Sequence, residues 1–149
     1  MEMISNEEKI TQAVLVSVDT GDYDAEASLA ELKELVKSAG AEPVFTVTQN
    51  LKRPETGTYV GTGKLQEIAD ICKQQEIDLL VFDCELSPTQ IRNIEAETDT
   101  RTIDRTMLIL DIFALRARSK EGKLQVELAQ LKYLMPRLTG KGVAMSRLG

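Results

Sequence analysis

The sequence predicts an α/β protein: a small four-stranded parallel sheet flanked by helices, followed by an antiparallel two-helix hairpin. In the first 103 residues, short Val- and Leu-rich runs alternate with amphipathic stretches, which is typical of a parallel sheet covered by helices. From residue 104 the apolar residues recur every three or four positions, as in helices that pack side by side. We therefore expect an α/β subdomain (1–103), a helical hairpin (104–138) and the start of a glycine-rich linker (139–149).

Four short runs are expected to form the strands. The first, residues 12–18, reads QAVLVSV and lacks the polar alternation of a half-exposed strand. Such runs are typical of strands that are buried on both faces of a parallel sheet. The other three expected strands are residues 42–49, 78–84 and 101–105.

Three helices are expected between these strands. The first lies within residues 24–40, where Gly40 is suited to end it. A second is expected near residues 64–75, and a third begins with Ser87 as N-cap and Pro88 at the first helical position. The apolar stripe of the first helix consists of Leu29, Leu32, Leu35 and Val36.

The hairpin is predicted from two apolar series separated by the polar residues 118–122. Two helices of roughly 16 residues, folded back on one another, explain this pattern best. One long continuous helix is the alternative, and Gly122 disfavours it. The expected seam of the first helix is Met107, Leu110, Ala114 and Ala117, and that of the second is Leu124, Leu128, Leu131, Met135 and Leu138.

Charge is distributed unevenly along the chain. The net charge is −6, but residues 1–100 hold 8 Lys/Arg and 20 Asp/Glu, whereas residues 101–149 hold 10 and 4. The carboxy-terminal part is therefore suited to meet a polyanion that the amino-terminal part would repel.

Composition excludes several classes of function. The chain has no His, which removes the commonest general base and metal ligand and excludes Ser–His catalysis. We expect neither a catalytic nor a metal site. The two cysteines, Cys72 and Cys84, are expected to be reduced core residues, in keeping with a cytoplasmic protein. No run of about 20 apolar residues is present, so no membrane span is expected.

The stretch TYVGTGKLQEI, residues 58–68, has some features of a phosphate loop. That motif requires G-x-x-x-x-G-K-[ST], and here Gly63 and Lys64 match whereas Thr58 and Leu65 do not. We therefore expect no nucleotide hydrolysis. Two interpretations stay open: a turn in which Gly61 and Gly63 adopt unusual backbone angles, or an anion or nucleotide site of Gly61, Gly63 and Lys64 at a helix N-terminus.

Four carboxylates follow the first and third expected strands: Asp19, Asp22, Asp83 and Glu85. Ligands of open α/β sheets bind at this edge, so a Mg²⁺ site is one interpretation. Solvated turn and cap residues are the interpretation that we favour.

The stretch RARSKEGK places four cations within eight residues at the expected hairpin turn: Arg116, Arg118, Lys120 and Lys123. A hairpin turn lies far from the core, where its cations can reach phosphates. Each phosphate neutralised releases counterions, so the pattern favours salt-sensitive RNA binding. A solvated basic loop is the alternative, and a seam that pairs with a partner's helix would instead indicate a protein-interaction domain.

Three segments resemble the N-terminal region of HflX-type GTPases: GTYVGTGKLQEI, DRTMLILDIFALRARSKEGKLQVELAQLKYLMPRL and the final RLG. The resemblance covers nearly the whole chain and is strongest over residues 101–138. It implies a small parallel α/β subdomain joined to a helical hairpin. It also implies a glycine-rich linker and a C-terminal GTPase domain beyond residue 149, where GTP and Mg²⁺ would bind. This chain has neither a complete phosphate loop nor an N-K-x-D motif, and we expect no cofactor of its own and no enzymatic activity.

The resemblance further implies a ribosomal function. Family members bind the large ribosomal subunit, reach toward the peptidyl transferase centre, and split or rescue stalled ribosomes, including after heat stress. Some have been proposed to bind adenine nucleotides through the N-terminal region, for which residues 61–64 are one candidate. The ribosomal RNA contacts carried over by position are Arg116, Arg118, Ser119, Lys120, Glu121, Gly122 and Lys123.

Overall fold

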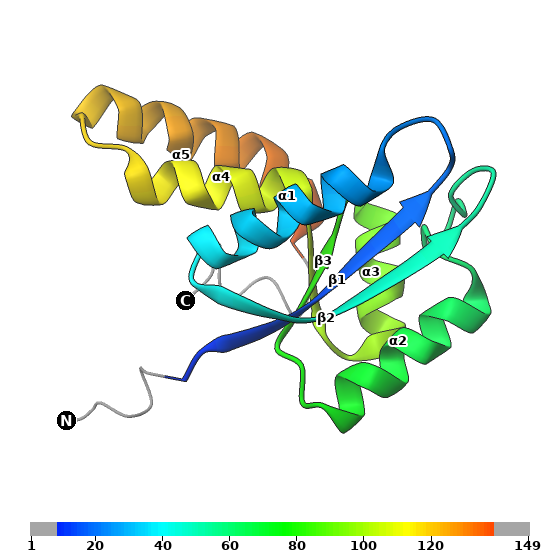
Figure 1. Ribbon diagram of the computed structural model, residues 1–149. Helices are drawn as coiled ribbons and strands as arrows, with labels where there is room; N and C mark the ends of the chain where they lie inside the picture. The colour runs from blue at the N-terminus through cyan, green and yellow to red at the C-terminus, as the bar shows by residue number, and fades with distance from the viewer. Residues whose placement is uncertain (1–8, 139–149) are drawn as a thin grey trace.

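The computed structural model describes residues 9–138 and confirms the α/β fold with its four-stranded parallel sheet (Figure 1). The strands are β1 (Thr11–Asp19), β2 (Ala41–Asn50), β3 (Leu79–Phe82) and β4 (Arg101–Asp104). The helices are α1 (Ala25–Ser38), α2 (Thr62–Gln74), α3 (Pro88–Thr98), α4 (Arg105–Arg116) and α5 (Lys120–Leu134), and a 3₁₀ turn, η1 (Met135–Arg137), follows α5.

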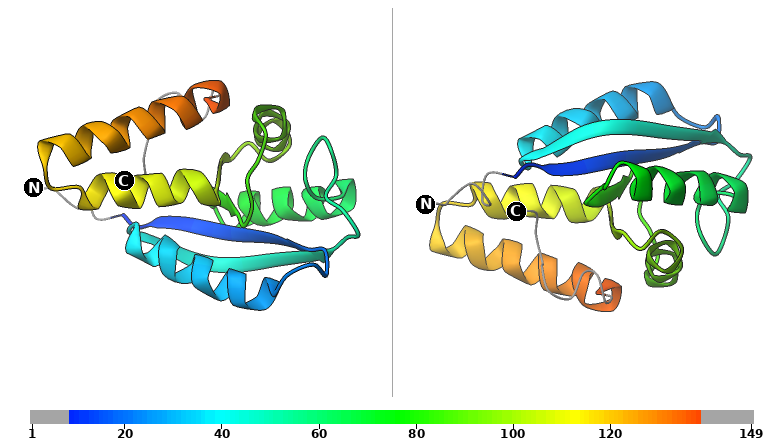
Figure 2. Two further views of the ribbon diagram at one scale, coloured as in Figure 1. Left: turned by 90° about the horizontal axis from the view of Figure 1, so that it is seen from above. Right: turned by 90° about the horizontal axis from the view of Figure 1, so that it is seen from below.

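The sheet has the strand order β2-β1-β3-β4, and all three pairs are parallel. Residues of α1 and α4 pack on one face of the sheet, and residues of α2 and α3 pack on the other (Figure 2). Since β1 and β3 are buried between the two layers, β3 is apolar throughout and the buried residues 13–18 of β1 are apolar except for Ser17, in keeping with the predicted apolar runs.

Local sequence signals set the helix ends. The Asp24 carboxylate accepts from the Ala27 N–H at 3.0 Å and begins α1, and Gly40 follows its end at φ +93°. Ser87 and Gln90 form a reciprocal capping box, with Pro88 at the first position of α3. The predictions for Gly40, Ser87 and Pro88 are confirmed.

The segment before α2 differs from the prediction. The helix begins at Thr62, and Gly61 is its N-cap with an ordinary extended backbone (φ −66°, ψ 161°). Gly63 lies inside the first turn and has no positive φ, so the expectation of unusual angles at these two glycines is wrong. The left-handed residue is instead Tyr59, at φ +67°.

The hairpin prediction is confirmed, because α4 and α5 are separate helices that pack against each other and project from the sheet (Figure 1). Its turn is shorter than expected and comprises only residues 117–119. Gly122 lies in the first turn of α5 rather than between the helices, so it does not break the helix.

The seam predicted for the second helix is wrong. Leu124, Leu128, Leu131 and Met135 are each more than half exposed, and together they form an apolar stripe on the outer side of α5. The buried side chains of α5 are Gln130 and Leu134, while Val126 and Tyr133 are half-buried. Heptad spacing identified an apolar face of the helix but did not show which way that face points.

A matched pair of leucines tests this orientation. Leu134→Ala should lower the free energy of unfolding by about 2–4 kcal/mol, because a 7% exposed leucine leaves a cavity. Leu128→Ala should cost less than about 1 kcal/mol, since that side chain is already 54% exposed. Urea denaturation followed by circular dichroism measures both. Equal losses would show that the stripe is buried.

Candidate RNA-binding tip

The residues carried over from the family lie together at the free end of the hairpin. We call the group Arg116, Arg118, Ser119, Lys120, Glu121, Gly122 and Lys123 the basic tip. Every member is exposed except Gly122, which is half-buried. The basic tip lies at the end of the molecule opposite the loops that follow β1 and β2 (Figures 1 and 2). Its position agrees with the prediction that the cations are held away from the core.

The backbone of the basic tip is fixed by its own sequence. The Ser119 hydroxyl accepts from the Gly122 N–H at 2.9 Å, and the Ser119 carbonyl accepts from the Lys123 N–H at 3.0 Å. A Cβ at Gly122 would lie 2.9 Å from the Ser119 Oγ, so a larger residue there would have to displace the serine hydroxyl from its present position. The carboxylate of Glu121 sits in the first turn, where the helix dipole favours negative charge.

The cations of the basic tip are not neutralised within the described part of the chain. The ion pairs among residues 9–138 involve Lys9, Lys37, Lys64 and Arg105, and none includes a tip residue. Four positive side chains are therefore exposed at the end of an elongated support. This arrangement is suited to phosphate contacts.

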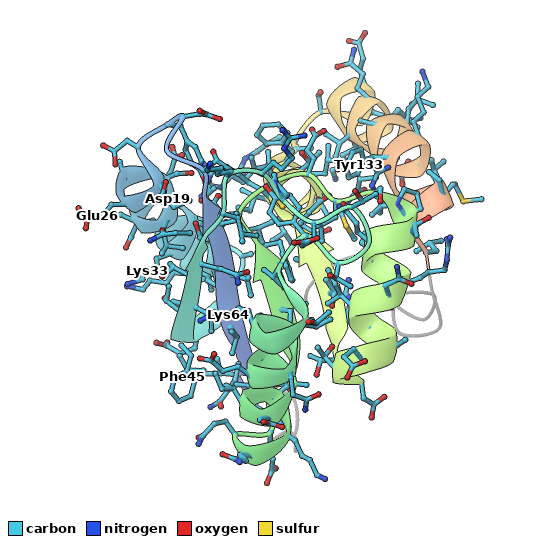
Figure 3. All side chains as sticks on the ribbon, turned by 90° about the vertical axis from the view of Figure 1, so that its right-hand side faces the viewer. Asp19, Glu26, Lys33, Phe45, Lys64 and Tyr133 are labelled. Carbon is cyan, nitrogen blue, oxygen red and sulfur yellow. The ribbon has the colours of Figure 1, made fainter. Side chains whose placement is uncertain are left out.

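The root of the hairpin is held by a buried carboxylate that the sequence reasoning missed. Asp104 is fully buried at the junction of β4 and α4. Its Oδ1 accepts from the Met107 N–H at 2.9 Å and so caps α4, while its Oδ2 accepts from the Leu86 N–H at 2.9 Å. The Tyr133 hydroxyl of α5 donates to the same Oδ2 at 2.6 Å, and in Figure 3 Tyr133 lies on the side of α5 toward the sheet.

Two arginines reinforce this root. Arg137 lies 3.8 Å from the centroid of the Tyr133 ring and donates from Nε to the Leu86 carbonyl at 3.0 Å. Arg105, the first residue of α4, donates to Asp83 at 2.7 Å and also pairs with Glu31 of α1. Both helices of the hairpin are thus fixed to the α/β subdomain by polar contacts.

The ionisation of these groups follows from their burial. Burial raises the pKa of Asp104, and the hydrogen bonds from Leu86, Tyr133 and Met107 oppose that rise. Burial and the hydrogen bond to Asp104 raise the pKa of the Tyr133 hydroxyl, which stays a neutral donor. Burial alone would lower the pKa of Arg105, but the hydrogen bond and charge of Asp83 outweigh it, so that pKa is raised.

The predicted anion site at residues 61–64 is at the other end of the molecule from the basic tip. The Gly61 N–H donates to the Gln49 side chain at 2.9 Å, and the Lys64 ammonium lies 3.3 Å from Glu67. These internal partners occupy two of the groups that an anion would need. Binding by Gly61, Gly63 and Lys64 stays a prediction.

The four carboxylates near the sheet edge do not form a metal site within the described residues. Asp19 accepts from the Gly21 N–H in the turn, and Glu85 accepts from the Thr106 hydroxyl. Asp83 differs from the expected solvated residue, because it is buried and paired with Arg105. Cys72 is buried as predicted, and Cys84 is half-buried against the core. No helix among residues 9–138 is long and apolar enough to cross a membrane.

Comparison with known proteins decides the family. The profile described as "GTP-binding GTPase N-terminal" matches residues 26–114, and that described as "GTP-binding GTPase Middle Region" matches residues 116–149. The chain belongs to this family: it is an HflX N-terminal region. It is 52% identical over 142 residues to the GTPase HflX of Alkalihalophilus pseudofirmus, and 52% identical over 128 residues to that of Escherichia coli.

Solved structures support the same assignment for this HflX N-terminal region. SsGBP in complex with GDP matches at 32% identity with a TM-score of 0.66, over 87% of this chain and 36% of that one. A GTP-binding protein of Sulfolobus solfataricus in complex with GDP matches at 32% identity with a TM-score of 0.63, over 86% and 38%. The two HflX relatives are matched over 94% and 85% of this chain but only 34% and 30% of their own lengths. The HflX N-terminal region thus spans about a third of its curated relatives.

Removing the Tyr133 hydroxyl tests the root of this HflX region. Tyr133→Phe should lower the free energy of unfolding by about 1–3 kcal/mol, because the Asp104 carboxylate loses a buried donor. The pKa of Asp104 is raised in the folded state. The contribution of Asp104 to the free energy of unfolding is therefore fully present below about pH 4, the ordinary pKa of aspartate, and is lost as the pH rises through the folded-state pKa. The Tyr133 hydroxyl donates to the Asp104 carboxylate and reduces that loss. The decrease in the free energy of unfolding caused by Tyr133→Phe should therefore be larger at pH 7 than near pH 4.

Tyr23→Phe is the matched control, since the Tyr23 hydroxyl donates to the uncharged Val18 carbonyl. Its deficit should not grow between the two pH values. Denaturant titrations at both pH values measure the difference. A Tyr133→Phe deficit that stays constant with pH would contradict a hydrogen bond that becomes more stabilising as Asp104 ionises.

Proposed function

We propose that this chain is the ribosome-binding module of an HflX-type GTPase, and that its basic tip contacts ribosomal RNA of the large subunit. The observation that supports the proposal most directly is the exposed group of four cations, unpaired within residues 9–138, at the free end of a firmly rooted hairpin. Relatives are named GTPases and similar structures contain GDP. In the whole protein, GTP and Mg²⁺ would be bound by a C-terminal GTPase domain, and the module would work in the cytoplasm.

The shape of the module suits a recessed RNA target. Ribosomal RNA near the peptidyl transferase centre is enclosed by other RNA, so a contact there requires a narrow probe. The hairpin is narrow, and the acidic α/β subdomain is at the opposite end, where RNA would repel it. Splitting or rescuing of ribosomes, including under heat stress, would then couple tip binding to the GTPase domain.

Neutralising the basic tip tests the proposal. The quadruple change of Arg116, Arg118, Lys120 and Lys123 to Ala should weaken cosedimentation with large ribosomal subunits by 100-fold or more, as roughly expected when several cations no longer neutralise phosphates. The slope of log affinity against log salt should also fall, by roughly 1 for each phosphate that is no longer neutralised.

The matched control removes the same charge from the α/β subdomain, by changing four exposed cations, Lys33, Lys52, Lys73 and Arg92, to Ala. This variant should bind large subunits with nearly the affinity and salt slope of the wild type. Equal losses in the two variants would indicate a non-specific effect of net charge, and no loss in the tip variant would refute the proposal.

The alternative function is nucleotide binding by the α/β subdomain through Gly61, Gly63 and Lys64. The first turn of α2 has no side-chain cap, which leaves amide donors for a phosphate. Calorimetry with ATP and with GTP should show heat that Lys64→Ala removes. The absence of heat at millimolar nucleotide would eliminate this function.

A further inference from the structure

A hollow of about 370 Å³ lies between the two helices beside the basic tip. The sequence reasoning did not find it, and we call it the tip hollow. It is lined by Ala114 and Leu115 of α4, by Ala117 of the turn, and by Lys123, Val126 and Glu127 of α5. Its volume is within the range of small-molecule sites, which begin at roughly 300 Å³.

The tip hollow exists because small residues meet where the helices separate. Ala114 and Ala117 project only a methyl group each, and α4 ends at Arg116 just before the turn. Ala114, Ala117 and Val126 are half-buried, so these three apolar side chains are partly shielded from water, whereas more of the exposed lining is polar than apolar. Two charged residues, Lys123 and Glu127, lie among the lining residues, one helical turn apart on α5.

We propose that the tip hollow binds one unpaired RNA base that carries an exocyclic amino group. This inference rests on the proposed function, since the RNA brought by the basic tip is the source of the base. The apolar side chains of Ala114, Ala117 and Val126 accept the face of a base, and the neighbouring cations neutralise its phosphates. Glu127 supplies an acceptor for the amino group, as carboxylates do for the N4 amino group of cytosine.

The charges of the described residues favour this occupant. No ion pair within residues 9–138 joins Lys123 to Glu127, so both groups are available to a ligand. The other three tip cations, Arg116, Arg118 and Lys120, lie in the chain between the lining residues Leu115 and Lys123. A base paired in a duplex does not fit, because its amino group and both its faces are already occupied.

Fluorescence anisotropy with three labelled RNAs tests the proposal: oligo(rC) and oligo(rU), each of about 10 nucleotides, and a duplex of about 16 base pairs. The wild-type chain should bind oligo(rC) more tightly than either of the others. Ala114→Leu fills the hollow without changing charge. It should weaken oligo(rC) binding about tenfold, the scale expected when one base can no longer be accommodated, and leave the salt slope unchanged.

Ala129→Leu is the matched control, because Ala129 is exposed on α5 and does not line the hollow. It should leave oligo(rC) binding unchanged. Glu127→Gln changes no volume and keeps the test valid if Ala114→Leu fails to fold. It should reduce the preference for oligo(rC) over oligo(rU), because glutamine keeps one neutral acceptor oxygen and adds an N–H donor that suits uracil.

Two results would overturn the proposal: wild-type affinity for oligo(rC) in both Ala114→Leu and Glu127→Gln, or equal binding of the duplex and oligo(rC) by the wild type. Neither result touches the proposed function, which depends on the tip cations and large subunits. If neutralising the tip leaves subunit binding intact, both proposals fail.

Discussion

The hairpin depends on one buried carboxylate. Asp104 begins α4, holds the loop before α3 through the Leu86 N–H, and accepts the hydroxyl of Tyr133 from α5. A buried ionised group is stable only when hydrogen bonds replace its water, and here three donors do so. Because those donors come from three separate segments, the carboxylate fixes both helices of the hairpin to the sheet. The hairpin is therefore a rigid extension of the α/β subdomain.

Because the hairpin is attached at its root, the positive charges of the basic tip are held apart from the acidic α/β subdomain. The α/β subdomain carries most of the acidic residues, and two groups of cations in the last third of the chain have different roles. Arg105 and Arg137 face inward and hold the root, whereas Arg116, Arg118 and Lys123 face outward at the tip. A net charge of −6 conceals a module whose positive end is well separated from its negative end. Such a molecule approaches a polyanion in one orientation.

Much of the fold was predictable because its signals are local. Buried parallel strands read as unbroken apolar runs, and caps such as Ser87 act on the next few residues. The orientation of α5 was not predictable, because two of its faces follow helical spacing. One is the exposed stripe of Leu124, Leu128, Leu131 and Met135, and the other includes the inward-facing Val126 and Leu134. Choosing between them requires knowing what the partner helix offers, which is a property of the tertiary structure.

For the same reason, some residues of the candidate site were predictable from the sequence and others were not. The cations of the tip were evident as a cluster in the sequence. Gly122 was expected in the turn, but it lies in the first turn of α5, where its N–H donates to the Ser119 hydroxyl. The root was missed because Asp104, Tyr133 and Arg137 are far apart in sequence, and the segment that resembles the family does not show that they contact one another. Asp104 did directly precede a helix, the one local signal that pointed to a cap. The tip hollow was missed because it arises from where two helices separate.

The central claim is that the root holds the basic tip at a fixed distance from the body, and a spin-label distance measurement tests it most directly. Labels would be placed at Lys120 on the tip and Lys73 on α2, both exposed, in a chain whose Cys72 and Cys84 are replaced by Ala. The account predicts one narrow distance distribution, which broadens in Tyr133→Phe. A broad distribution without that substitution, or a short distance that places the tip against the sheet, would contradict it.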